Sequence, residues 1–305
     1  MSDGFLERFM AMPMPAESRT LQLLYAEPPR RTVAELTRVV QGYHPEMAAA
    51  TVEWHSAANE QEGYAAVSRQ GPPASGYGLI GWGQHRFRVY EFATAMPYGP
   101  VETCVVPAMM PPDLKAAARE HQSHLLLDYV GDHPEPLEQY VALAATAGAL
   151  CRFGGITVLH EEARAAVPWY DLLPDDGEDG LETLRALPIP YLWGGFVKLD
   201  VGDSARPWVR TFACQRLGLP NLAYHLPSHG ETSRIFRVFS ALLGYLRETG
   251  SELHAGDELD LGEFRGRVRL PHDTEWYLES SGAMFVLEEV ANPVDFSAHP
   301  EGGRS

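Results

Sequence analysis

The sequence predicts an α+β protein with mainly antiparallel sheet, built from two units of ferredoxin-like size that pack as one compact body. Short apolar runs typical of strands recur along the 305 residues, and amphipathic segments with a period near 3.6 residues separate them. The first half follows the order β-α-β-β-α-β, which is that of a ferredoxin-like unit. We expect the two units at residues 16–131 and 132–290, followed by a disordered tail at residues 291–305.

The first unit is expected to contain two helices between its strands. Thr32 is a suitable N-cap for the first helix, whose Val33, Leu36 and Val40 share one apolar face. The second helix opens at Pro112 and runs through residue 119. Strands are predicted on either side of these helices, at residues 21–25, 51–55, 86–95 and 124–130.

The second unit opens with a helix at residues 136–153, whose many alanines allow another element to approach closely. A strand is expected at residues 156–160, and two paired strands at residues 191–200 and 208–216. Ser228 and Glu231 have the spacing of a capping box. The helix that follows carries one apolar stripe, and residues 257–290 return to extended structure. The stripe consists of Ile235, Phe236, Phe239, Leu242, Leu243 and Leu246.

Composition limits the partners of the chain. Its 41 acidic and 24 basic side chains give a formal net charge of −17, and Lys115 and Lys198 are its only lysines. This charge repels phosphate backbones, and the sequence shows no basic cluster, so we expect no nucleic-acid binding. The charge favours solubility, and it also favours a protein partner with a basic face.

The lengths of the apolar runs and the spacing of the cysteines indicate the cellular compartment of the protein. No stretch approaches the roughly 18 uninterrupted apolar residues that cross a bilayer, and the first ten residues mix charged with apolar side chains. Cys104, Cys151 and Cys214 lie far apart without a Cys-x-x-Cys spacing, so neither a disulfide framework nor a zinc site is expected. We therefore expect a cytoplasmic protein with reduced thiols and no membrane contact.

Residues 208–226, with Gly-Leu-Pro at 218–220, resemble the Gly-Leu-Pro-centred segment of a bacterial family called domain of unknown function 4261. Residues 21–28, 96–102 and 120–128 resemble the opening strand, a proline-rich turn and a histidine-then-strand junction of that family. The family has no assigned activity, so the resemblance implies no site residues. The chain departs from the family pattern at Asn221, where a carboxylate is expected, and at residues 156–160, where a tryptophan-rich strand is expected.

Two patterns suggest a cofactor or a metal. Gly76, Gly78 and Gly81 have the spacing of a dinucleotide fingerprint, but prolines precede them and a strand follows, so no helix N-terminus would meet a pyrophosphate. We expect a flexible loop there. His121 and His124 have a spacing that would put two imidazoles on one helix face, but the helix is expected to end between them and no third ligand is placed. The sequence therefore predicts no cofactor and no metal.

Nucleophilic catalysis has one candidate pair and one candidate base. Cys214 lies eleven residues before His225, and a thiolate beside an imidazole is a nucleophile, although core packing of Cys214 is the favoured interpretation. His229 is expected at a helix start, where the dipole lowers its pKa. Neighbouring carboxylates point apart on a helix or strand, so the acidic pairs are interpreted as solvated surface. They are Glu161 with Glu162, Asp175 with Asp176, and Glu288 with Glu289.

We assign no catalytic, cofactor-binding or metal residue from these patterns. The missing catalytic motifs and the acidity favour a non-enzymatic interaction protein, such as an immunity-type protein or an inhibitor that masks a basic partner. Two alternatives stay open. One is a hydrolase that uses cysteine and histidine brought together by the fold, and the other is a structural or assembly component.

Overall fold

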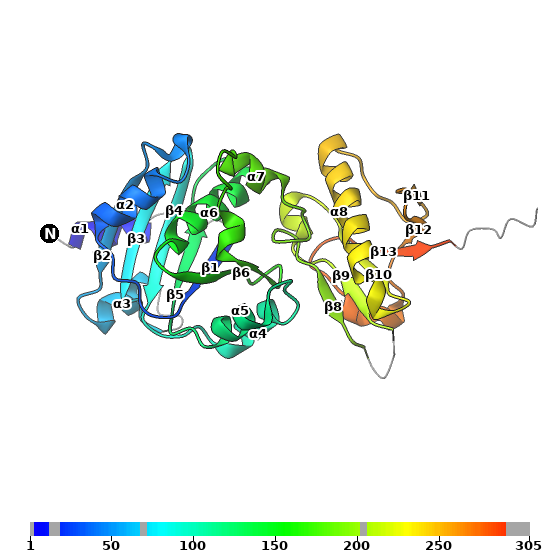
Figure 1. Cartoon of the computed structure of the whole chain (residues 1–305), viewed down its shortest axis with the longest axis horizontal. Helices are drawn as coiled ribbons and strands as arrows, with labels where there is room; N and C mark the ends of the chain where they lie inside the picture. The colour runs from blue at the N-terminus through cyan, green and yellow to red at the C-terminus, as the bar shows by residue number, and fades with distance from the viewer. Residues whose placement is uncertain (1–2, 12–18, 68–71, 202–205, 291–305) are drawn as a thin grey trace, which may run out of the picture.

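The computed structural model describes residues 3–11, 19–67, 72–201 and 206–290, and it shows an α+β protein with two mainly antiparallel sheets. The sheets lie toward opposite ends of the long axis, and helix α8 (Thr232–Thr249) lies beside the second (Figure 1). The tail expected at residues 291–305 falls outside the described residues. In the described ranges, no helix combines the length and the apolar character needed to cross a membrane.

The first sheet has seven strands in the order β2-β3-β4-β5-β1-β6-β7, and all neighbouring strands are antiparallel. The strands are β1 (Arg19–Tyr25), β2 (Thr51–Ser56), β3 (Gly76–Trp82), β4 (His85–Phe92), β5 (Ser123–Tyr129), β6 (Gly155–His160) and β7 (Ala165–Pro168). Helices α2 (Val33–Gln41) and α6 (Pro136–Cys151) cover one face. The other face is covered by α1 (Asp3–Ala11), α3 (Glu60–Ala66), α4 (Tyr98–Val105) and α5 (Pro112–Arg119).

The strand order differs from that of the predicted ferredoxin-like unit. In a ferredoxin-like unit, one strand separates the two parallel strands of each β-α-β crossover. Here three strands, β3, β4 and β5, separate β1 from β2. The sheet also continues through β6 and β7, so the boundary expected at residues 131/132 falls inside it. The last strand of the first sheet, β7, ends at Pro168, and the first strand of the second sheet begins at Val197.

The prediction of a flexible loop at the fingerprint glycines is wrong, because Gly76–Trp82 is the buried strand β3 between β2 and β4. The glycines allow β2 to pack closely against it. A methyl group at Gly78 would lie 2.4 Å from the carbonyl oxygen of Glu53 and 2.7 Å from the ring of Trp54. The pattern that resembles a phosphate loop therefore serves strand packing.

The second sheet has six strands in the order β11-β12-β13-β10-β9-β8, in which only β10 and β13 are parallel neighbours. The pairing expected between residues 191–200 and 208–216 is present over three residues of each segment, and a 3-10 helix follows at Cys214–Leu217. The strands are β8 (Val197–Leu199), β9 (Trp208–Arg210), β10 (Asn221–His225), β11 (Glu258–Asp260), β12 (Arg265–Arg269) and β13 (Met284–Glu289).

Helix α8 buries the apolar stripe that the sequence predicts, with Phe236 half-buried at its border. The predicted capping box is absent: Ser228 precedes a 3-10 turn at His229–Glu231, and its side chain forms no cap hydrogen bond. The chain needs this extra turn to enter α8, so the serine lies too far from the first amides of the helix. Gly250 ends α8 in a left-handed conformation, as expected of a C-terminal glycine.

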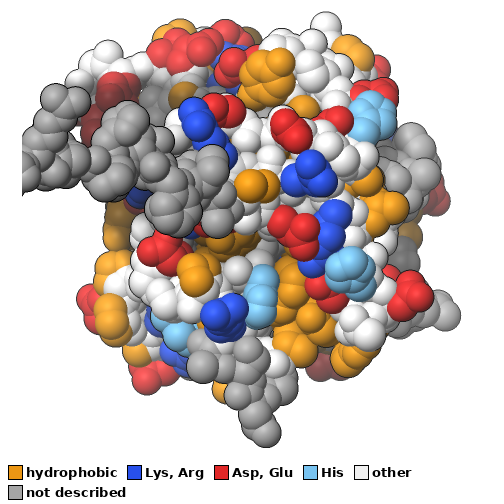
Figure 2. Space-filling model, turned by 90° about the vertical axis from the view of Figure 1, so that its right-hand side faces the viewer, with side chains coloured by type: hydrophobic (Ala, Val, Ile, Leu, Met, Phe, Trp, Pro, Cys, Tyr) orange, Lys and Arg blue, Asp and Glu red, His pale blue; other side chains and the backbone are white. Residues whose placement is uncertain are grey.

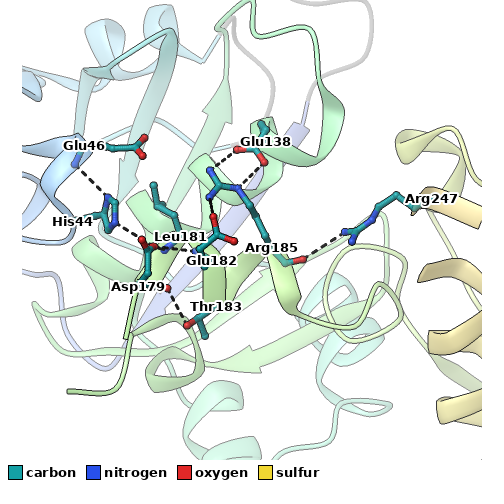
Figure 3. A network of polar contacts seen from close by, with 9 residues as sticks. All are labelled: His44, Glu46, Glu138, Asp179, Leu181, Glu182, Thr183, Arg185 and Arg247. Carbon is teal, nitrogen blue, oxygen red and sulfur yellow. Dashed lines mark hydrogen bonds and ion pairs between the residues drawn. The ribbon is translucent and has the colours of Figure 1, made fainter. Parts of the chain in front are cut away.

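Helix α7 (Gly180–Ala186) joins the two halves through a polar network (Figure 3). Arg185 donates hydrogen bonds to both carboxylate oxygens of Glu138 on α6, at 2.7 and 2.8 Å, and its carbonyl oxygen accepts from Arg247 of α8 at 3.5 Å. The hydrogen bond from Arg185 lowers the pKa of Glu138. At the other end of α7, Asp179 caps the helix and lies 3.2 Å from His44. The network fixes α7 between the first sheet and α8.

Candidate binding groove

Two adjoining hollows flank strand β8 at the junction of the two halves, and together we call them the groove. The first, of about 630 Å³, lies between α4 with its following loop and β8; the second, of about 570 Å³, lies between β8 and the 3-10 helix Asp273–Leu278. Both hollows are lined by Arg164, Lys198 and Asp200.

The groove follows the edge of β8. Val197 and Lys198 are successive residues whose side chains point to opposite faces of the sheet, yet both line the first hollow. Lys198 and Leu199 likewise both line the second hollow. In the described chain β8 pairs with β9 alone, so its other edge meets no strand.

Four cationic side chains line this groove: Lys115, Arg164, Lys198 and Arg210. They include both lysines of the chain. None of the four forms an ion pair with a carboxylate of the described residues, whereas most other arginines do, as the ion pairs of Arg119, Arg185, Arg216, Arg234, Arg237 and Arg269 illustrate.

Three carboxylates also lie in the groove. Glu102 is neutralised by Arg119, whose Nε lies 2.6 Å from its Oε1. Asp200 is exposed at the centre, and Glu279 lies in the second hollow, where its backbone carbonyl accepts from Arg210. The groove therefore carries a local excess of positive charge on a strongly acidic protein.

Two guanidinium groups lie against one aromatic ring. The Cζ atoms of Arg164 and Arg210 lie 4.2 and 4.1 Å from the ring centroid of Phe212. Arg210 is buried and donates to the carbonyl oxygens of Tyr277 and Glu279. Burial first, and then the charge of Arg164, lower the pKa of Arg210 to about 10, so it remains charged at neutral pH.

Exposed apolar side chains border the cations. Val106 and Met109 are each 57% exposed beside the first hollow, and Trp276 is 75% exposed beside the second. Aromatic and methionine side chains are enriched in protein interfaces, and large apolar groups of this kind anchor partners. The groove thus combines cations, apolar anchors and an unpaired strand edge.

The walls of the groove are held together by a close backbone contact. Gly195, just before β8, has φ +60°, and a methyl group on it would lie 1.8 Å from the carbonyl oxygen of Ala163. Ala163 belongs to the turn between β6 and β7, where Arg164 also has positive φ, at 52°. The contact places Arg164 of the first half beside Lys198 of the second.

The two histidines considered as metal ligands are engaged by backbone groups. His121 Nε2 accepts from the amide of Met96 at 2.7 Å, and its Nδ1 lies 2.7 Å from the carbonyl oxygen of Ala118. His124 bonds the carbonyl of Thr94 and stacks on Phe92, and burial lowers its pKa to about 4. Among the residues that the structure describes, no three His, Cys, Asp or Glu side chains form a metal cluster.

The residues considered for nucleophilic catalysis do not form a common site. Cys214 is fully buried, and its amide donates to Asn221 Oδ1. His225 is exposed and stacks on Trp208. His229 is the candidate that reaches the groove, because its Nδ1 lies 3.2 Å from Lys198 Nζ.

The members of one acidic pair, Glu288 and Glu289, contact different partners. Glu288 pairs with Arg269, and the adjacent Glu289 pairs with Arg234. Asp175 and Asp176 are exposed in the loop before α7.

We expect all three thiols to be unreactive in the native protein. Cys104, Cys151 and Cys214 are free and buried, and burial raises the pKa of Cys104 and of Cys214 to about 12 and that of Cys151 as well. A thiolate is the reactive form, so Ellman's reagent at pH 8 should label the native protein slowly and all three thiols after unfolding in guanidinium. Rapid labelling of one native cysteine would contradict this expectation.

Sequence reasoning did not find the groove, because its residues come from six separated segments of the chain. One signal was present: both lysines of an arginine-rich chain are groove residues. In comparisons with known proteins, no family model, curated protein or solved structure matches this chain.

Proposed function

We propose that this protein is a non-enzymatic interaction protein whose partner binds in the groove. The proposal rests on one observation. The groove brings together four cations that lack a described carboxylate partner, exposed apolar side chains and the strand edge of β8 that pairs with no described strand. Placing an anionic group beside cations that lack a described carboxylate partner gains charge-assisted hydrogen bonds, and covering Trp276 and Met109 removes apolar surface from water.

The buried cysteines argue against the cysteine hydrolase. A nucleophile must be accessible and readily deprotonated, and Cys214 is neither. None of the three cysteines lines the groove. The proposal therefore assigns binding, and no covalent chemistry, to this region.

A second candidate function is the masking of a basic protein partner, as in an immunity-type protein or an inhibitor. It is supported by the net charge of −17 and by Asp175 and Asp176, which are exposed and form no ion pair with a described cation. Acidic and basic side chains intermix on the end of the molecule shown in Figure 2, so that end presents no broad acidic face. The same net charge supports the prediction that nucleic acid is not the partner.

Affinity capture from the native host with three immobilised proteins distinguishes the two candidates. We expect the partner captured by the parent to be lost with the double variant Arg164→Glu/Lys198→Glu and retained with Asp175→Lys/Asp176→Lys. Both double variants change two exposed residues and reverse two charges, so they are matched. Retention by the groove variant would refute the groove as the contact site.

Salt separates the candidates further. The Debye length is about 30 Å at 0.01 M and about 8 Å at 0.15 M, so steering of a basic partner by the whole acidic surface should fade over this range. Loss of the partner with the loop variant alone, together with association that slows as salt rises, would favour the masking function.

A further inference from the structure

We propose that the groove binds an extended, acidic segment of a protein partner as an additional strand on the free edge of β8. This inference rests on the proposed function and adds the mode of binding and the chemistry of the bound segment. It follows from three features of the groove, which are the strand edge, the cations on both of its sides and the apolar borders.

The edge supplies the backbone contacts. A strand with one partner presents a row of amides and carbonyls on its other side, and an extended peptide satisfies them by strand addition. Because Val197, Lys198 and Asp200 all line the first hollow, space is present alongside this row. β8 is three residues long, so it spans about 10 Å and pairs with a segment of similar length.

The cations supply the charge preference. Side chains of an added strand point alternately to opposite faces of the sheet. One face meets the first hollow with Lys115, the other meets the second hollow, and the exposed Arg164 and Lys198 line both hollows. A carboxylate on either side of the added strand therefore meets a cation that has no described carboxylate partner.

The apolar borders supply anchors. Val106 and Met109 lie beside the first hollow and Trp276 beside the second, so apolar side chains between the carboxylates have surfaces to cover. The acidic surface as a whole repels an acidic segment at long range. At 0.15 M salt that repulsion is screened beyond about 8 Å, whereas contacts inside the groove persist.

A lysine in a short edge strand also has a protective role, because it discourages uncontrolled pairing between sheets. If protection were the whole role of Lys198, the variant Lys198→Val would self-associate and the parent would bind no extended peptide. Size-exclusion chromatography with light scattering on Lys198→Val, read beside the peptide measurements below, distinguishes the two roles.

Display selection provides the test. A random twelve-residue peptide library is panned at 0.15 M salt against the full-length protein, with counter-selection on Arg164→Glu/Lys198→Glu. We expect enriched peptides that alternate carboxylate and apolar residues. The strongest synthetic peptide should bind Lys198→Glu at least about tenfold more weakly than the parent, which corresponds to about 1.4 kcal/mol. It should bind the parent and Arg267→Glu equally, since Arg267 is an exposed arginine at the other end of the second sheet.

Backbone methylation tests strand addition itself. In an extended peptide, the amides of successive residues point to opposite edges, so only every second amide can donate to β8. N-methylation of those amides should abolish binding, whereas N-methylation of the intervening amides should leave binding unchanged. Equal tolerance of both methylated sets would overturn strand addition while leaving the groove as a binding site.

Two further results would overturn the preference for an acidic segment. These are enrichment of basic peptides, or tighter binding of a single-stranded oligonucleotide than of any selected peptide. Failure of the selection, combined with groove-dependent capture of a host protein, would refute the extended acidic segment and leave the proposed function standing.

Discussion

Replacing Gly195 with alanine is expected to destabilise the protein by about 2 to 5 kcal/mol. The residue has φ +60°, and the added methyl group would lie 1.8 Å from the carbonyl oxygen of Ala163. A left-handed alanine costs about 1 to 2 kcal/mol, and overpacking of a tight contact costs about 1 to 3 kcal/mol. Urea unfolding at pH 7 measures the change.

The matched control is Gly218→Ala. Gly218 also has positive φ, at +71°, but no atom lies within 4 Å of the added methyl group. We expect this control to lose only the conformational part, about 1 to 2 kcal/mol. Equal losses in the two variants would show that the contact between Gly195 and Ala163 does not hold the walls together.

The same substitution is expected to impair binding under conditions where the protein remains folded. Relief of the overlap requires Ala163 or β8 to move, and Arg164 would move away from Lys198 because it adjoins Ala163. A selected peptide should therefore bind Gly195→Ala more weakly than Gly218→Ala. Unchanged affinity would indicate that the groove tolerates separation of its walls.

Acidification from pH 7 to pH 4 is expected to destabilise the protein strongly through its buried histidines. Burial lowers the pKa of His85 and of His124 from 6.5 to about 4. Between pH 6.5 and 4, these histidines are therefore protonated in the unfolded chain and neutral in the folded protein. The contribution to stability is complete above pH 6.5 and is lost as the pH falls toward 4, with an upper limit of about 3 kcal/mol for each histidine.

Urea unfolding at pH 7, 6, 5 and 4 tests this pH dependence. The variant His124→Phe should show a shallower loss between pH 6.5 and 4 than the parent. His254→Asn is the control, because His254 is 68% exposed in its side chain. Parallel losses in the parent and in His124→Phe would contradict the assignment. Glu138, whose pKa is lowered, adds a loss at still lower pH.

Features that depend on the residues of one segment alone were predicted from the sequence. The apolar stripe of α8 and the cap at Thr32 are confirmed, and Thr32 forms a full capping box with Glu35. The strand at Gly76–Trp82 was missed because glycine has low strand propensity. The segment forms a strand because Trp54 of β2 packs closely against its glycines. This contact involves a neighbouring strand, so the segment's own residues do not reveal it.

The arrangement of the strands and the groove depends on contacts between distant segments. The insertion of β3 puts three strands between β1 and β2, and no local pattern distinguishes this order from the ferredoxin-like one. The cations of the groove come together only when Gly195 packs on Ala163. In the sequence, three strands and two α-helices lie between Lys115 and Lys198, so their proximity could not be read from spacing.

The central position of β13 has a consequence for synthesis on the ribosome. β13 (Met284–Glu289) lies between β12 and β10, and the residues around Trp276 that border the groove come just before it. The first sheet is complete once residue 168 has emerged, whereas the second lacks an inner strand until more than a hundred further residues have followed. Until then one edge of β10 is open and the nascent chain depends on protection from aggregation. Translation that stops early would therefore yield a folded first sheet that has no competent groove.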